Sequence, residues 1–241
     1  MSDTRTPYRL EVRNLHTGYG RIEVLREIDI AVPAGSVVAL LGPNGAGKTT
    51  ALNAIAGSLP VRRGDLLLDG RSVRGLTTYE RAKNGIVLVP EGRGVFPSLS
   101  VRENLEVVVR GSDCGDDERE ARLAEVLEIF PRLAERLPQR AGTMSGGEQQ
   151  MLALSRAFLC SPRVLLMDEI SMGLAPRVVE HLFEAVQTLR SRGMTIVLVE
   201  QFLTYALRFA DVCYVLNKGR VSFVGEPSEL RDGAGADYLS A

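Results

Sequence analysis

Apolar and polar residues alternate along the first part of the chain, which is the pattern of half-buried strands. The alternation covers residues 10–15 and 22–32, on either side of a Gly18-Tyr19-Gly20 segment that predicts a turn between them. Residues 36–41 form a nearly continuous apolar run that ends in glycine, so we expect a strand buried on both faces of a sheet. Further short strands are predicted at residues 65–68 and 86–89.

Apolar residues recur at helical spacing in the segments between and after these strands. Residues 48–56 predict a helix, and Thr77 with Glu80 has the spacing of a capping box that opens another helix over about 79–83. A second pair of this kind, Ser100 and Glu103, opens a stretch in which one helical pattern follows another. We therefore expect a helical sub-domain between strands of an α/β core. Its helices are predicted from Ser100 to about residue 108, over about 121–130, and over 146–159.

Strand and helix patterns alternate again after residue 160. The whole chain, residues 1–241, is then expected to form one α/β domain. Residues 1–90 and 161–241 make its core, with antiparallel strands at the N-terminal end, and residues from about 91 to 160 make the helical sub-domain. The later strands are predicted at 164–167, 195–199, 212–216 and 221–224, and the later helices at about 177–190 and from Pro227 onward.

The composition is that of an ordinary globular protein. Hydrophobic residues make up 45% of the 241, and the formal net charge of -1 gives no electrostatic reason to expect a nucleic-acid partner. No apolar run approaches the roughly 20 residues needed to cross a bilayer, and the first residues carry no secretory signal. We expect a chain that is soluble by itself, with reduced thiols at Cys114, Cys160 and Cys213 because their spacing fits no metal site.

A glycine-rich motif joins the buried strand at residues 36–41 to the helix at 48–56. Its glycines let the backbone turn N–H groups toward a phosphate without Cβ clashes, and the helix adds the positive end of its dipole. Lys48 can place its charge on terminal phosphates, and the Thr49 hydroxyl can ligate Mg²⁺. A plain strand-to-helix turn is the alternative. The predicted nucleotide-binding residues are Gly42, Pro43, Asn44, Gly45, Ala46, Gly47, Lys48, Thr49 and Thr50.

Two acidic residues, Asp168 and Glu169, stand at the end of the apolar run at residues 164–167. A carboxylate at this place can hold Mg²⁺ directly or through water, which we expect of Asp168. Glu169 would then orient or deprotonate the water that attacks a phosphate. The alternative is a pair of solvated carboxylates at a strand end, the usual location of such residues.

A third motif, Ser145-Gly146-Gly147-Glu148-Gln149, opens the helix predicted at 146–159. Ser145 and Glu148 have capping-box spacing, so they can simply begin the helix. A capped helix N-terminus with two glycines is also a suitable anion site. Both interpretations stand together.

The ordered set of Tyr19, the glycine-rich loop, the Ser145 motif and the Asp168-Glu169 pair resembles the nucleotide-binding subunit of an ATP-binding cassette (ABC) protein. The resemblance covers nearly the whole chain and implies a P-loop NTPase core that uses ATP and Mg²⁺. It also implies that two subunits pair head to tail, so that Ser145, Gly146, Gly147 and Glu148 of one close over the ATP held by the other. Tyr19 matches the aromatic residue that stacks on adenine, although packing is the alternative for a lone tyrosine in a turn.

Two positions depart from the general ABC pattern. Glu91 stands where the family usually has glutamine, and Gln201 stands where it usually has a histidine that senses the γ-phosphate. A glutamine can still donate a hydrogen bond to phosphate but cannot become cationic, and Glu91 could approach Mg²⁺ or water. The histidines, His16 and His181, lie elsewhere in the chain, and we expect surface or packing roles for them.

These departures are similar to those of the smaller ATPase of branched-chain amino-acid importers. The similar segments are Pro90-Glu91-Gly92-Arg93, Val199-Glu200-Gln201 and residues 168–176, in which Ile170 replaces an expected proline. The resemblance implies that Glu169, Gln201 and Lys48 serve hydrolysis and that Thr49, Glu91 and Asp168 surround the metal.

The function implied is an ATP-hydrolysing motor of an importer for branched-chain or other hydrophobic amino acids, at the cytoplasmic face of the membrane. Its partners would be a second ABC ATPase subunit, two membrane permease subunits and, indirectly, a solute-binding protein. Phe96 lies where family members meet the permease, or it packs on the helical sub-domain. Two alternatives remain: the same motor with urea, an amide or another small solute as cargo, and a soluble ABC ATPase without a transport role. A kinase or GTPase would leave the Ser145 motif unexplained.

Overall fold

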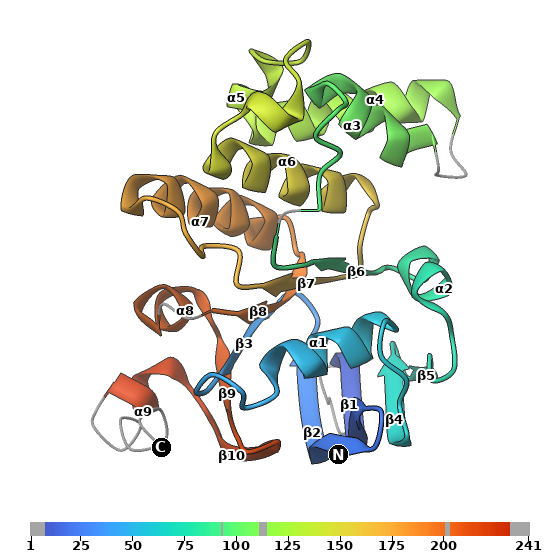
Figure 1. Ribbon diagram of the computed structural model, residues 1–241, viewed down its shortest axis with the longest axis vertical. Helices are drawn as coiled ribbons and strands as arrows, with labels where there is room; N and C mark the ends of the chain where they lie inside the picture. Colours follow the sequence, from blue (N-terminus) through green and yellow to red (C-terminus); the bar gives the residue numbers. More distant parts are fainter. Residues whose placement is uncertain (1–7, 93, 111–114, 201–202, 232–241) are drawn as a thin grey trace, which may run out of the picture.

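The computed structural model describes residues 8–92, 94–110, 115–200 and 203–231, with the side chain of residue 231 excepted. The predictions for Arg93, Cys114 and Gln201 fall outside these residues. Among the described residues, Cys160 is exposed and Cys213 is buried, and neither forms a disulfide. The strands form a four-stranded sheet and a six-stranded sheet, stacked with helices between and above them (Figure 1).

The four-stranded sheet has the order β2-β1-β4-β5 and is antiparallel. The predicted turn at Gly18-Tyr19-Gly20 is wrong in position, since Tyr19 is the last residue of β1 and the turn falls at Gly20 and Arg21. Gly18 pairs with Glu23 beside a register shift, where a Cβ would lie 2.0 Å from the Ile22 oxygen. Close strand contact therefore explains that glycine. The strands are β1 (Tyr8–Tyr19), β2 (Ile22–Pro33), β4 (Arg63–Leu68) and the unpredicted β5 (Arg71–Ser72).

The six-stranded sheet has the order β10-β9-β3-β8-β7-β6 and is parallel except for the edge strand β10. Every residue of β3, β7 and β8 is buried, which explains their continuous apolar sequences. Parallel pairing places the C-terminal ends of β3, β7 and β8 at the same edge of the sheet. The strands are β3 (Val37–Leu41), β6 (Ile86–Val89), β7 (Val164–Asp168), β8 (Thr195–Val199), β9 (Val212–Asn217) and β10 (Arg220–Gly225).

Alternate residues of the central strands pack into different hydrophobic clusters. Val197 and Val199 face the cluster that contains α1 (Lys48–Ala56) and the four-stranded sheet, so α1 lies between the two sheets (Figure 1). Ile196 and Leu198 face the opposite cluster, which contains α7 (Pro176–Ser191). The period of two along β8 thus separates the two layers that cover this sheet.

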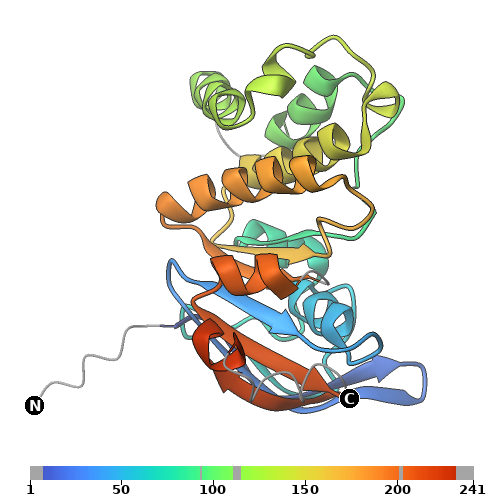
Figure 2. The same ribbon diagram turned by 90° about the vertical axis from the view of Figure 1, so that its left-hand side faces the viewer.

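Helices form the segment between β6 and β7, as predicted. Both α6 (Gly146–Leu159) and α7 belong to the same hydrophobic cluster, and they run side by side above the six-stranded sheet (Figure 2). Because the helical segment shares its core with the sheet, we interpret it as a sub-domain within one domain. It comprises α3 (Val101–Arg110), α4 (Asp116–Ile129), α5 (Pro131–Ala134), the 3₁₀ turn η1 (Ala141–Thr143) and α6.

The predicted capping boxes are confirmed at three helix starts. Thr77 and Glu80 cap α2 (Thr78–Lys83), with both reciprocal hydrogen bonds present. The Ser100 N–H donates to Glu103 over 2.7 Å, and the Glu103 N–H donates back to the Ser100 hydroxyl over 3.2 Å. Ser145 and Glu148 cap α6 in the same way.

The described residues near the C-terminal end contain two further short helices. These are α8 (Leu203–Phe209), which was not predicted, and α9 (Pro227–Arg231).

Candidate active site

The glycine-rich loop connects β3 to α1 and leaves the start of that helix uncapped. Gly47 is the N-cap, with φ 105°, and it offers no side chain to the first-turn N–H groups. Helix N-termini carry N–H groups without intrahelical partners, and here they remain available to an anion. Gly42, with φ 138°, approaches the neighbouring strand so closely that a Cβ would lie 2.1 Å from the Leu216 oxygen. This close approach requires glycine at position 42, and the uncapped helix start is suited to an anion.

The Lys48 ammonium is held inside this loop. It donates to the carbonyl oxygens of Gly42, over 2.9 Å, and Pro43, over 3.2 Å, and the residue is 5% exposed. Burial lowers the pKa of Lys48, against the nearby charges of Glu169 and Asp168, which act to raise it. The ammonium group therefore lies within the loop, against its carbonyl oxygens.

Thr49 and Asp168 are in contact although they belong to different elements. The Thr49 hydroxyl donates to the Asp168 carboxylate over 3.2 Å. Burial raises the pKa of Asp168 to about 6, and the charges of Glu169 and Glu91 act in the same direction, against the Thr49 hydrogen bond and the Lys48 charge. A hydroxyl beside a destabilised carboxylate is a suitable pair of ligands for a hard cation such as Mg²⁺.

Protein ligands alone do not complete a metal site in this part of the structure. Within the described ranges, no group of three or more His, Cys, Asp or Glu side chains is placed to hold a metal ion. Mg²⁺ commonly takes one or two protein oxygens together with phosphate oxygens and water. The Thr49–Asp168 pair fits that mode of binding.

Glu169 follows β7 in an uncommon backbone conformation. Its φ is 47°, in the left-handed region, and its N–H donates to the Val199 oxygen at the end of β8 over 2.9 Å. Glu169 and Glu91 both line a cavity of about 420 Å³. The structure therefore brings Glu91, from the segment after β6, to the same place as Glu169.

Ser145 begins α6 as its N-cap and is exposed. The Glu148 carboxylate accepts hydrogen bonds from the Ser145 N–H, over 2.9 Å, and hydroxyl, over 2.8 Å. Although burial alone would raise it, these bonds and the charges of Arg136 and Arg132 hold the pKa of Glu148 below its ordinary value. The motif is locally satisfied and directed to the surface.

Gly147 has a packing role within the same motif. It is buried, and a Cβ at this position would lie 2.0 Å from Cγ1 of Val178 on α7. The missing side chain therefore lets α6 and α7 approach each other. Gly146 precedes it as the first residue of α6.

Residues 25–171 match the sequence model of a protein family described as ABC transporter. The chain belongs to this family. It is an ATP-binding motor subunit of an ABC transporter, and thus an ATPase.

This ABC subunit is similar to two proteins from branched-chain amino acid transport. It is 44% identical to the high-affinity branched-chain amino acid transport ATP-binding protein BraG of Pseudomonas aeruginosa, over 88% of this chain and 90% of BraG. It is 37% identical to a probable branched-chain amino acid transport ATP-binding protein LivF of Archaeoglobus fulgidus, over 92% and 93% of the two chains. A solved structure of an ATP-binding subunit of an ABC transporter, 29% identical, superposes with a TM-score of 0.80 over 96% of this chain and 95% of that one.

Tyr19 lies at the tip of the β1–β2 hairpin of the ABC subunit. Its side chain is 50% exposed, so the ring is available for stacking. Arg62 fastens the hairpin tip by donating to the Gly20 oxygen over 2.7 Å. The exposed position favours the stacking interpretation of Tyr19 over simple packing.

Sequence reasoning missed a buried polar pair beside Glu169. The Ser171 N–H donates to Oε1 of Glu200 over 3.1 Å, and the Ser171 hydroxyl donates to Oε2 of the same carboxylate. Ser171 is fully buried and Glu200 is 3% exposed. A glutamate directly after the apolar run of β8 was the available signal, since such a residue is rarely buried without a partner.

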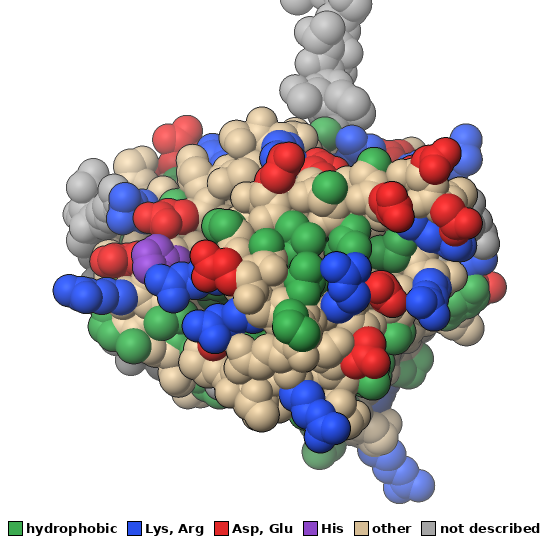
Figure 3. Space-filling model, turned by 90° about the horizontal axis from the view of Figure 1, so that it is seen from above, with side chains coloured by type: hydrophobic (Ala, Val, Ile, Leu, Met, Phe, Trp, Pro, Cys, Tyr) green, Lys and Arg blue, Asp and Glu red, His purple; other side chains and the backbone are tan. Residues whose placement is uncertain are grey.

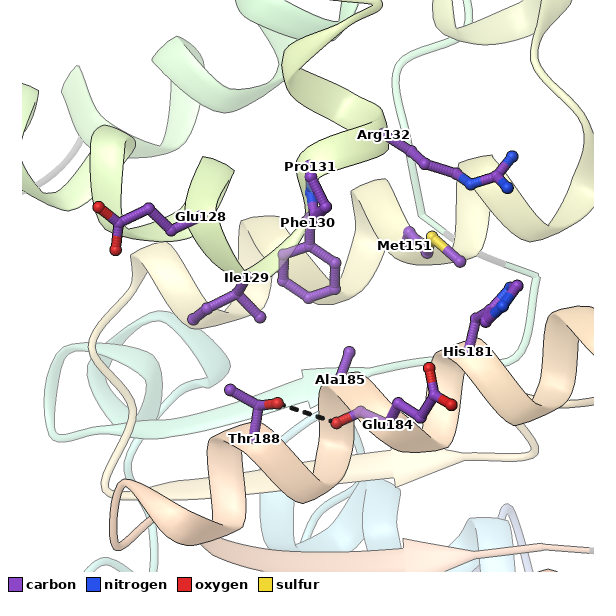
Figure 4. A pocket seen from close by; sticks show the side chains of 10 residues that line it. All are labelled: Glu128, Ile129, Phe130, Pro131, Arg132, Met151, His181, Glu184, Ala185 and Thr188. Atoms are coloured by element: carbon purple, nitrogen blue, oxygen red, sulfur yellow. Dashed lines mark hydrogen bonds between the residues drawn. The ribbon is translucent and has the colours of Figure 1, made fainter.

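The two histidines lie apart from these residues, as expected. His16 is 8% exposed and contacts Glu23 and Asn14 through its ring nitrogens. His181 is exposed on α7 and borders a second pocket of about 370 Å³, between α7 and the junction of α4 and α5 (Figure 4). None of the predicted nucleotide or metal residues lines this second pocket. Its lining residues are Glu128, Ile129, Phe130, Pro131, Arg132, Met151, His181, Glu184, Ala185 and Thr188.

The end of the molecule formed by the helical sub-domain carries charges of both signs. Figure 3 shows apolar side chains gathered near its middle, with lysine, arginine, aspartate and glutamate side chains around them. In the described part of the chain, no helix has both the length and the apolar character that crossing a membrane requires.

Proposed function

We propose that this subunit hydrolyses ATP to drive the import of branched-chain or other hydrophobic amino acids. The observation that supports this choice of transported solute is the 44% identity to BraG over nearly the full length of both chains. The presence of Glu91 and Glu200-Gln201 supports the same branch of the family. The geometry around Thr49 and Asp168 supports the chemistry.

In this proposal, residues 42–50 hold the phosphates of ATP. The uncapped N–H groups at the start of α1 contact phosphate oxygens, and Lys48 moves from the loop carbonyls to the terminal phosphates. Thr49 and Asp168 hold Mg²⁺, with Glu91 near enough to influence Asp168 electrostatically. The metal supplies positive charge that offsets the charge of the phosphates. Tyr19 stacks on the adenine.

Glu169 is the residue that orients and deprotonates the attacking water in the proposal. This role is supported by the position of Glu169 directly after Asp168 and by its place in the lining of the 420 Å³ cavity. Gln201, which lies outside the described residues, would donate a hydrogen bond to the γ-phosphate from its side-chain amide.

The proposed assembly is a head-to-tail pair of ATPase subunits on two permease subunits at the cytoplasmic face of the membrane. Ser145 is exposed and bonded within its own helix, which supports a role toward the nucleotide of a second subunit. Phe96 is 43% exposed, with the Arg156 guanidinium 4.5 Å from its ring centroid. The exposed part of Phe96 is available to a permease, and the rest packs on the sub-domain.

The Glu169→Gln variant tests the chemistry. It should bind ATP as the native chain does, while hydrolysis falls at least about 100-fold, because a general base is worth that much or more. Glu180→Gln, at an exposed position on α7, is the matched control and should keep full turnover. Full turnover by Glu169→Gln would exclude it as the base.

The cargo is tested by uptake into vesicles that contain the membrane complex co-purified with this subunit. ATP-dependent uptake of leucine or isoleucine is expected. Uptake of urea or an amide in place of amino acids would contradict the proposed cargo and leave the motor function standing. A chain that hydrolyses ATP but co-purifies with no membrane protein would contradict the transport role.

A further inference from the structure

The turn that carries Glu169 is tied to the end of β8 by a buried carboxylate. We propose that Glu200 is a positioning residue for ATP hydrolysis, which holds this turn through Ser171 and so fixes the place of Glu169. The inference rests on the proposed role of Glu169 as the base.

Two connections join the turn to β8. The Glu169 N–H donates to the Val199 oxygen over 2.9 Å, and the adjacent residue, Glu200, accepts both the N–H and the hydroxyl of Ser171. The turn closes on itself because the Met172 N–H donates to the Glu169 oxygen over 3.1 Å. Glu169 is therefore held by the strand end on one side and by the Ser171–Glu200 pair on the other.

Such restraint is needed because Glu169 has an uncommon backbone conformation. A non-glycine residue in the left-handed region costs free energy and persists only where its surroundings hold it. Glu169 has φ 47° and directly precedes the buried Ile170 and Ser171. Loss of the Ser171–Glu200 bonds would let the turn relax and would move the Glu169 carboxylate.

Burying the Ser171–Glu200 pair costs free energy of folding, which indicates that the pair has a catalytic or structural role. A carboxylate taken out of water is destabilising unless hydrogen bonds replace its hydration. Hydrogen bonds to a charged acceptor are roughly twice as strong as neutral ones. Glu200 therefore fixes Ser171 firmly, and with it the turn that carries Glu169.

A positioning role predicts a specific kinetic effect. Apart from the contact proposed for Gln201, the proposed phosphate contacts come from residues 42–50, which the Ser171–Glu200 pair does not hold. Loosening the turn should therefore lower kcat and leave the KM for ATP nearly unchanged. A merely structural role would lower thermal stability without lowering the kcat of the folded protein.

The experiment compares variants of the full chain, assembled as it is when it hydrolyses ATP. Ser171→Ala removes the hydroxyl, and Ser171→Thr keeps it. Glu200→Gln can still accept from the Ser171 N–H and pair with its hydroxyl, whereas Glu200→Ala cannot. The matched control is Thr195→Val at the start of β8, where the buried Thr195 hydroxyl accepts from the Gly35 N–H over 2.9 Å.

We expect Ser171→Ala to lower kcat about 10-fold or more with less than about a twofold change in KM, since small misplacements of catalytic groups have effects of this size. Ser171→Thr should restore most of kcat, and Glu200→Gln should retain more than Glu200→Ala. Thr195→Val should lose a comparable amount of thermal stability but keep the native kcat. If Glu200→Ala fails to fold, the kcat values of Ser171→Ala and Ser171→Thr are sufficient to test the positioning role.

The inference is overturned if Ser171→Ala keeps the native kcat, or if its KM rises while kcat stays the same. A fall in kcat that Thr195→Val shares at equal loss of stability would also overturn it. These results are distinct from failure of the proposed function. If Glu169→Gln itself retained turnover, the base would be wrong, whereas an inactive Glu169→Gln with a fully active Ser171→Ala would refute only the positioning role.

Discussion

The Thr49 hydroxyl donates a hydrogen bond to the Asp168 carboxylate over 3.2 Å, between residues that are 119 positions apart in the chain. Asp168 ends β7, and Thr49 lies in the first turn of α1. The contact brings the two proposed metal ligands together. It also leaves a buried carboxylate that a cation would stabilise.

Asp168→Asn is expected to stabilise the nucleotide-free chain at neutral pH. The folded-state pKa of Asp168 is raised from 3.8 to about 6, so the folded state binds more protons between these values and native stability falls as pH rises through this range. Near pH 4 and below, the native and variant proteins should differ little. At pH 7.5 the variant should gain at most about 3 kcal/mol, since one pKa unit corresponds to about 1.4 kcal/mol.

Urea unfolding of both proteins between pH 4 and 8 measures this difference. Asp117→Asn, at an exposed position in the first turn of α4, is the control: it keeps Asp168, so its stability should follow that of the native protein over this pH range. Equal stability of native and Asp168→Asn proteins at pH 7.5 would contradict the raised pKa.

Lys48→Ala is expected to weaken ATP binding. A hydrogen bond from a charged donor contributes about 1.5–3 kcal/mol, so the Kd for ATP should rise about 10- to 100-fold. Titration of the purified chain with ATP measures it, and Lys83→Ala, an exposed lysine on α2, serves as the control. An unchanged Kd for Lys48→Ala would exclude the proposed phosphate loop.

Ser145→Arg is expected to separate binding from hydrolysis. A single chain should bind ATP with native affinity, because Ser145 lies on the surface at the start of α6. Hydrolysis should fall at least about 10-fold, since a bulky cation would block the site shared with a second subunit. Loss of ATP binding by the single chain would contradict this shared-site arrangement.

Thr77→Arg is the matched control for Ser145→Arg. It removes the N-cap of another capping box, on α2, at a cost of about 1 kcal/mol. Native hydrolysis by Thr77→Arg shows that loss of a helix cap alone does not reduce turnover.

Gly147→Ala is expected to destabilise the chain by about 1–3 kcal/mol, because the added methyl group overpacks the α6–α7 contact. The atom in its way is Cγ1 of Val178, 2.0 Å from the ideal Cβ position. Adding Val178→Ala should recover part of the lost stability, as thermal or urea unfolding would show. If the double variant were no more stable than Gly147→Ala, another contact would be responsible.

Much of the local structure follows from the sequence because its causes are local. Strand and helix positions come from apolar periodicity, and the capping boxes at Thr77, Ser100 and Ser145 need only two residues three positions apart. The turn lies at Gly20 and Arg21, later than predicted, because β1 pairs with β2 as far as Tyr19 and Ile22, and such pairing depends on a partner strand that a local pattern does not show.

The sequence by itself determined the residue types of the site: a glycine-rich loop with Lys48 and Thr49, an acidic pair after a buried strand, and a capped helix start. Glycine backbones, short motifs and apolar runs act over a few residues, so a single chain displays them. Tertiary structure alone decided that Asp168 bonds Thr49, that Gly147 packs on Val178, and that Glu200 holds Ser171. The two hydrogen bonds depend on the strand order that places β8 between β3 and β7, and the Gly147 contact depends on how α6 packs on α7; no pattern along the chain specifies either arrangement.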